Sequence, residues 1–170
     1  MGVTAVSGSV LIVGCGRWSM GDDQAGLVTA EQLAGLRLPQ TTVALDESPG
    51  SGLAELMEGG EELLIVIDAA RADARHPEGS FTRIDDGAFP RELRTRGLCG
   101  THTLSVNAGL ELARALGVLP ADVWIYVIFG RTFDRSLGMR EAVAAAWQAT
   151  RAAQADDATA GNYSFDTLEE

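Results

Sequence analysis

The chain has 170 residues, 46% of them hydrophobic and 22% charged, which is ordinary for one globular domain with a buried core. Its formal net charge of −11 argues against a nucleic-acid partner, because phosphate binding needs clustered Lys and Arg. The first apolar run is too short to span a membrane and follows no basic segment. Cys15 and Cys99 suggest neither a disulfide framework nor a CxxC metal site. We therefore expect a cytoplasmic protein with reduced thiols and no membrane partner.

Strand-like and helix-like segments alternate along the chain. Apolar or β-branched runs predict strands at Ser9–Val13, Thr41–Leu45, Glu62–Asp68, Phe81–Ile84 (an edge strand) and Val123–Ile128. Helical spacing predicts helices from Asp23 to Gly35, at Leu53–Met57, after the lead-in Gly100–Leu104 as far as a stop at Gly117, and at Arg140–Ala153. This order predicts an α/β fold: a three-layer α/β/α sandwich with a mostly parallel central sheet. Residues 1–154 would form one domain and residues 155–170 an acidic, disordered tail.

Three residues with metal-binding side chains occupy equivalent places in this scheme. Asp23 follows the first strand, Asp68 ends the third, and His102 precedes the helix after the edge strand. Loops at the carboxyl ends of parallel strands gather at one crevice, so these side chains are expected to converge. Two carboxylates and an imidazole suit a divalent ion such as Zn²⁺ or Ni²⁺.

Each of these residues also has an ordinary structural interpretation. Asp22 or Asp23 could cap a helix, and Asp68 could bond to loop amides. His102 could be a structural or surface histidine, and His76, in a polar loop, is interpreted as solvated.

A second interpretation uses the same first loop. Gly14 and Gly16 after a strand, with Asp46 ending the next strand, weakly match a dinucleotide-binding fingerprint. Ser19 stands where the third glycine is expected, and Asp22 and Asp23 would place negative charge beside a pyrophosphate. The match favours a nucleotide site much less than a metal site.

An ordered series of motifs resembles the hydrogenase maturation endopeptidases. It starts with Val13-Gly-Cys-Gly16 and Met20-Gly-Asp-Asp-Gln-Ala-Gly26, followed by Asp46 and a glycine-rich turn. It continues with Leu64-Ile-Val-Ile-Asp-Ala69, the Thr101-His102 turn and the strand Val123–Gly130, and spans roughly Ser9 to Trp147.

The resemblance implies an activity and a site. These enzymes remove a C-terminal peptide from the large subunit of nickel–iron hydrogenases once nickel is installed in the precursor. By position, their metal-contacting residues correspond to Asp23, Asp68 and His102. The chain would thus be a metal-dependent endopeptidase whose nickel is carried by its protein substrate, the hydrogenase large-subunit precursor. In crystals, Zn²⁺ or Cd²⁺ could occupy the same site.

The chain departs from the family pattern at three places, the first two of them beside this site. Arg17 replaces the usual Asn, Gln24 the common Gly, and Gly130-Arg-Thr-Phe133 a G-I-E-P-like segment. A catalytically silent relative, acting as a binding module or chaperone for a metalloenzyme precursor, is the alternative. Trp18 and Met20 could help to dock a partner, although Trp18 could equally belong to the core.

Overall fold

The structure is a computed structural model that describes residues 9–57, 59–85 and 101–135, with only the backbone at 85 and 101–105. Its centre is a five-stranded sheet in the order β2-β1-β3-β5-β4. The strands are β1 (Ser9–Cys15), β2 (Thr41–Asp46), β3 (Glu61–Arg71), β4 (Phe81–Asp85) and β5 (Asp122–Gly130). All neighbours pair in parallel except β4, which is antiparallel to β5 at the edge. The predicted mostly parallel sheet is confirmed.

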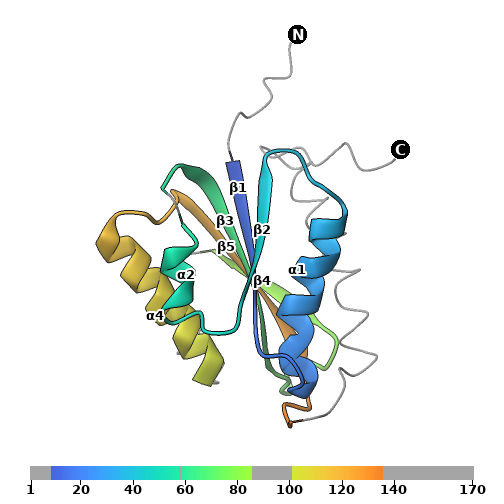
Figure 1. The fold of residues 1–170 in the computed structure, drawn as a ribbon. Helices are drawn as coiled ribbons and strands as arrows, with labels where there is room; N and C mark the ends of the chain where they lie inside the picture. The colour runs from blue at the N-terminus through green and yellow to red at the C-terminus, as the bar shows by residue number, and fades with distance from the viewer. Residues whose placement is uncertain (1–8, 58, 86–100, 136–170) are drawn as a thin grey trace.

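Helices cover both faces of the sheet. A short 3₁₀ turn, η1 (Gly21–Gln24), leads into α1 (Ala25–Gly35), and α2 (Gly52–Glu55) and α4 (Thr101–Leu116) follow later. Figure 1 shows the sheet edge-on, with α1 on one side and α2 and α4 on the other. The predicted three-layer α/β/α sandwich is therefore confirmed.

Alternation along the strands builds a separate apolar layer on each face. In β3, Leu64, Val66 and Ala70 pack in the core shared with α2 and α4, whereas Ile65 and Ile67 pack in the core shared with α1. Both sets are buried, as expected for a central parallel strand. Because side chains alternate between faces, Asp68 lies on the α2 and α4 side.

Several boundaries differ from the prediction, and three of them bear on the site. α4 begins at Thr101, so His102 lies in its first turn and not before the helix. β3 runs on to Arg71 instead of ending at Asp68, because its pairing with β5 continues as far as Gly130. Asp68 is thus a buried residue within the strand. The helix predicted from Asp23 starts as the turn η1, and α1 begins only at Ala25.

Other predictions fall beyond these residues. The helix at Arg140–Ala153 and the tail at 155–170 lie outside the described residues. Within the described ranges, every helix is too short or too polar to cross a lipid bilayer.

Candidate metal-binding and active site

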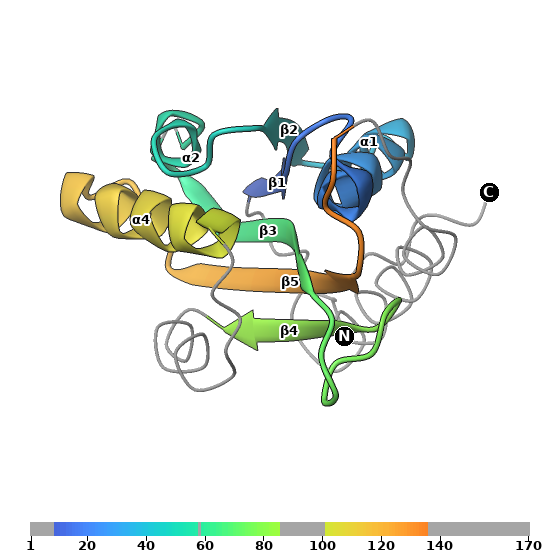
Figure 2. The same ribbon diagram turned by 90° about the horizontal axis from the view of Figure 1, so that it is seen from below.

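The predicted site residues lie at one edge of the sheet. The carboxyl ends of β1 and β3 and the first turns of α1 and α4 meet there, as Figure 2 shows from that side. Asp23 belongs to η1, Asp68 to β3, and His102 is the second residue of α4. The structure therefore brings Asp23 and Asp68 together and starts α4 at the same edge. The side chain of His102 lies outside the description, so its role stays a prediction.

Glycines let the start of α1 rest directly on the strand ends. A Cβ atom at Gly26 would overlap with the carbonyl oxygens of Cys15 and Ile67, the residue before Asp68. Gly16 has a φ of +145°, and a Cβ there would overlap with the carbonyl oxygen of Asp23. Only glycine fits at both positions. The glycines that frame the motif therefore bring the carboxylate of η1 close to that of β3.

Asp68 carries a buried carboxyl group at this edge of the sheet. It is 2% exposed, and neither side-chain oxygen makes a hydrogen bond with the residues that the structure describes. Burial raises its pKa from 3.8 to about 7, against the opposing effect of the nearby Ala69 amide, and the negative charge of Asp23 adds to the rise. Such a group is expensive to keep in an apolar core, which indicates a role other than stability.

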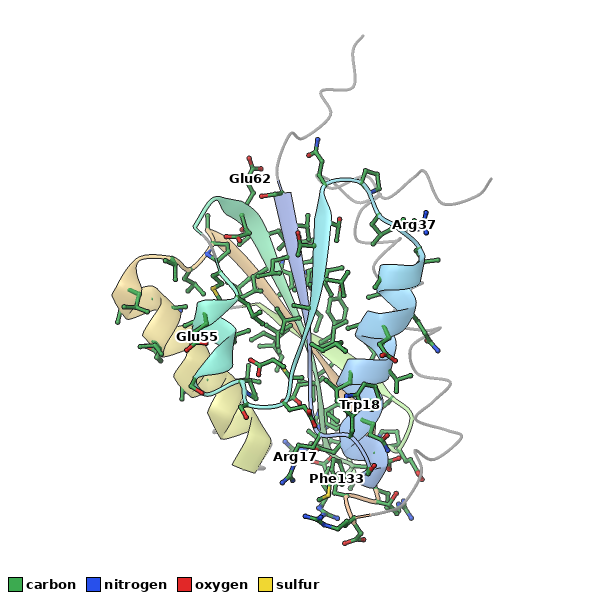
Figure 3. All side chains as sticks on the ribbon, in the orientation of Figure 1. Arg17, Trp18, Arg37, Glu55, Glu62 and Phe133 are labelled. Atoms are coloured by element: carbon green, nitrogen blue, oxygen red, sulfur yellow. The ribbon has the colours of Figure 1, made fainter. Side chains whose placement is uncertain are left out.

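Asp23 is equally buried, at 1% exposure, but faces a cation. The Nε atom of Arg17 lies 3.2 Å from its Oδ2 atom, and the Arg17 side chain is 45% exposed. Figure 3 shows Arg17 at the carboxyl edge of the sheet, between the starts of α1 and α4. Sequence reasoning noted Arg17 only as a departure from the family; the available signal was a cation six residues before the acid in one short loop.

Asp22 has a structural role that the sequence left open. Its Oδ2 accepts hydrogen bonds from the backbone amides of Arg131 (2.7 Å) and Thr132 (2.9 Å) and from the Thr132 hydroxyl (3.2 Å). Its own N–H donates to the Thr132 carbonyl at 2.6 Å. Neither η1 nor α1 has a side-chain cap. Asp22 therefore ties η1 to the segment after β5 instead of capping a helix.

The carboxylate of Asp46 bonds to the turn that follows β2. Its Oδ1 accepts the Ser48 amide at 2.8 Å, and its carboxylate packs against Gly52. It is 8% exposed, and burial raises its pKa. A carboxylate committed to a turn does not present itself to a ribose, so the structure adds no support to the nucleotide interpretation.

Cys15 ends β1 beside these acids. Burial, followed by the nearby charges of Asp68 and Asp46, raises the pKa of its thiol. The thiol is free and fully buried, which is the opposite of the environment of a reactive cysteine.

Two smaller predictions are settled by the structure. His76 is not solvated: its side chain is 14% exposed, its ring stacks on Phe129 at 4.4 Å between centroids, and its Nδ1 lies 3.0 Å from Asp73. The flat apolar surface of Phe129 gives the ring a better environment than water. Trp18 is 37% exposed, so it is available for contact with a partner.

The described side chains fit a cation in part. Among them, no three His, Cys, Asp or Glu residues are placed to hold a metal ion. The two buried oxygens of Asp68, next to Asp23, are nevertheless the hard oxygen donors that a divalent cation would satisfy. A third ligand would have to come from outside the described side chains, where the predicted ligand His102 lies, or from the ion's own carrier.

The architecture is that of a known class of proteins. No protein-family model and no curated protein sequence matches the chain. Solved structures do, and the chain has the fold of the hydrogenase maturation endopeptidases.

Two solved structures illustrate the similarity. The hydrogenase maturating endopeptidase HybD from E. coli is 18% identical, with a TM-score of 0.72 over 89% of this chain and 93% of that one. The [NiFe] hydrogenase maturation protease HybD from Thermococcus kodakarensis is 24% identical, with a TM-score of 0.71 over 90% and 99%. At these identities the similarity establishes the fold, as the resemblance implied.

Proposed function

We propose that this chain is an endopeptidase that removes a C-terminal peptide from the nickel-loaded precursor of a nickel–iron hydrogenase large subunit. The observation that carries the proposal is the buried pair of Asp23 and Asp68, at the edge of the sheet where α4, whose first turn includes His102, begins. The fold shared with hydrogenase maturation proteases supports this assignment.

In this proposal the metal ion is part of the substrate. Asp23, Asp68 and His102 would bind the nickel of the precursor and thereby orient the peptide bond to be cut. An ion at this position supplies Lewis acidity: it lowers the pKa of a bound water and stabilises the oxyanion that forms. Hydrolysis then adds one water across the peptide C–N bond. The protein's own contribution is to bind the ion and hold the bond in place.

The fully buried Asp68 explains why such a site would wait for its substrate. Its two oxygens lack hydrogen-bond donors in the described part of the chain, and in this proposal the cation of the substrate satisfies them. Binding energy from that contact would be gained with a loaded precursor and not with an empty one. Cleavage would therefore follow nickel insertion.

The proposal is tested by the intact mass of the large-subunit precursor incubated with the purified protein. Loss of a C-terminal peptide from the nickel-loaded precursor, but not from the nickel-free one, is the expected result. Asp68→Asn should abolish the cleavage, whereas Glu31→Gln, a change at an exposed position of α1, should leave it intact. Normal cleavage by Asp68→Asn would refute the assigned role.

A second candidate function rests on the Arg17–Asp23 contact. Because a cation already neutralises one of the two acids, the site could hold a metallated partner without cutting it. In that case the chain would be a binding module or chaperone for a metalloenzyme precursor. A stable complex with the unprocessed subunit, together with an unchanged mass, would favour this function.

A further inference from the structure

Arg17 contacts the carboxylate pair at Asp23, on the side that faces solvent. Its Nε atom contacts the Oδ2 atom of Asp23, a group that is almost completely buried, while nearly half of the Arg17 side chain remains exposed. The guanidinium therefore lies between solvent and Asp23. Asp23 in turn is close enough to Asp68 to raise the pKa of that group. Any ion that reaches the pair from this side comes within a few ångströms of a fixed positive charge.

The loop holds Arg17 in this place from both sides. On one side, the Gly16 amide donates to the Asp46 carbonyl at 3.3 Å. On the other, the Trp18 amide donates to the Glu47 carboxylate at 3.1 Å. The backbone of Arg17 is thus anchored to the turn after β2. These anchors keep the backbone of Arg17 within reach of Asp23, where the Nε–Oδ2 contact forms.

This arrangement treats a bare cation and a complexed one differently. A bare divalent ion at Asp23 must either displace the guanidinium or lie beside it, where the two positive charges repel each other. An ion that arrives with an anionic group of its own avoids this conflict. That group can accept hydrogen bonds from the guanidinium, which carries five N–H donors and uses its Nε on Asp23.

We propose that Arg17 is a specificity-determining residue that makes the Asp23–Asp68 pair reject free divalent ions and accept an ion carried in an anionic complex. The inference rests on the proposed function in taking the pair as the metal-binding site. It adds the chemical class of the ligand: a metal centre with net negative ligands around it. Free metal ions would then not occupy the site ahead of the substrate.

The test compares two forms of one metal by calorimetric titration of the purified protein. One probe is aqueous Ni²⁺. The other is Ni²⁺ held by nitrilotriacetate, which carries a net negative charge and leaves two coordination positions open. For the unaltered protein and Arg17→Gln, the ratio of the two affinities is measured. Arg37→Gln is the matched control, because Arg37 is exposed and lies at the opposite end of the molecule (Figure 3).

We expect Arg17→Gln to bind aqueous Ni²⁺ about tenfold more tightly than the unaltered protein does and to lose about tenfold in its preference for the anionic complex. Arg17→Lys should keep much of the preference, and Arg37→Gln all of it. Adding Asp23→Asn to Arg17→Gln should remove the gain. An unchanged affinity ratio in Arg17→Gln would overturn the proposal, and the ratio is insensitive to a general loss of binding sites.

The role of Arg17 and the endopeptidase function can be refuted independently of each other. If Arg17→Gln shows the expected change but no precursor is cleaved, the charge selection stands and the endopeptidase proposal falls. If the precursor is cleaved but the affinity ratio does not depend on Arg17, the peptidase stands and the role of Arg17 falls. Both measurements use the full chain.

Discussion

Replacing Asp68 by Asn should make the metal-free protein more stable at alkaline pH. The folded protein raises the pKa of this carboxyl from 3.8 to about 7, chiefly through burial. At ~1.4 kcal/mol per pKa unit, keeping the ionised form folded costs about 4 kcal/mol above pH 7. Asn removes the charge but brings amide donors that also lack partners, at a cost of about 2 kcal/mol. The net gain at about pH 8 is therefore about 2 kcal/mol.

The raised pKa determines the direction in which stability changes with pH. A carboxyl with a raised pKa in the folded state leaves stability intact below its unfolded pKa, and the loss accumulates as pH rises from about 4 to about 7. At about pH 5.5 roughly half of the penalty has accumulated, so the gain from Asn should fall to near zero. The sequence pI is about 4.5, so the protein keeps a net negative charge at both pH values. The unknown amide cost cancels in the difference between the two pH values, which should be about 2 kcal/mol.

The free energies of unfolding at the two pH values are measured by urea denaturation in the presence of a chelator, with tryptophan fluorescence as the signal. Glu31→Gln serves as the control, because this exposed position should give the same difference at both pH values. A stability difference between the unaltered protein and the Asp68→Asn variant that does not change with pH would refute the reasoning. So would an Asp68→Asn variant that is less stable than the unaltered protein at about pH 8.

Three further predictions follow from the packing around the site. Gly26→Ala should lower the free energy of unfolding by about 3 kcal/mol through overlap with two strand carbonyls, whereas Gly35→Ala, with open space around it, should be neutral or stabilise by about 0.5 kcal/mol in thermal melts. Asp22→Ala should cost about 3 kcal/mol in urea denaturation and expose the segment after β5 to limited proteolysis, because three hydrogen-bond donors of that segment lose their shared acceptor. Cys15 should resist iodoacetamide in the native protein and react once unfolded, as peptide mapping would show; rapid native alkylation would contradict its burial and raised pKa.

The layer architecture was predictable because burial leaves a strong pattern in sequence. β3 is buried on both faces from Leu63 to Ala70, and an apolar run of that kind indicates a central parallel strand without further information. Its end was not predictable. Residues 69 to 71 continue the ladder only because β5 pairs with them, and pairing partners are a tertiary property.

Half of the candidate site could be predicted and half could not. Topology alone places Asp23 and Asp68 at one edge, since the carboxyl ends of parallel strands meet there. The contact of Arg17 with Asp23 depends on the path of a five-residue loop, from Gly16 to Met20, and on its anchors at Asp46 and Glu47. Loop paths of this kind are set by contacts distant in sequence, so a cation six residues before the acid allows the contact but does not predict it.

The adjacent residues Asp22 and Asp23 differ in role, and the structure distinguishes them. In the sequence either Asp22 or Asp23 could be a helix cap, whereas Asp23 is the predicted ligand. In the fold, three donors satisfy one oxygen of Asp22, and the group serves to fix the segment after β5. Asp68, across the site, has no hydrogen-bond donor among the described residues and a raised pKa. A carboxylate that is buried at a cost and left without donors is retained for what it binds, and this points to Asp68 rather than Asp22 as the residue on which function depends.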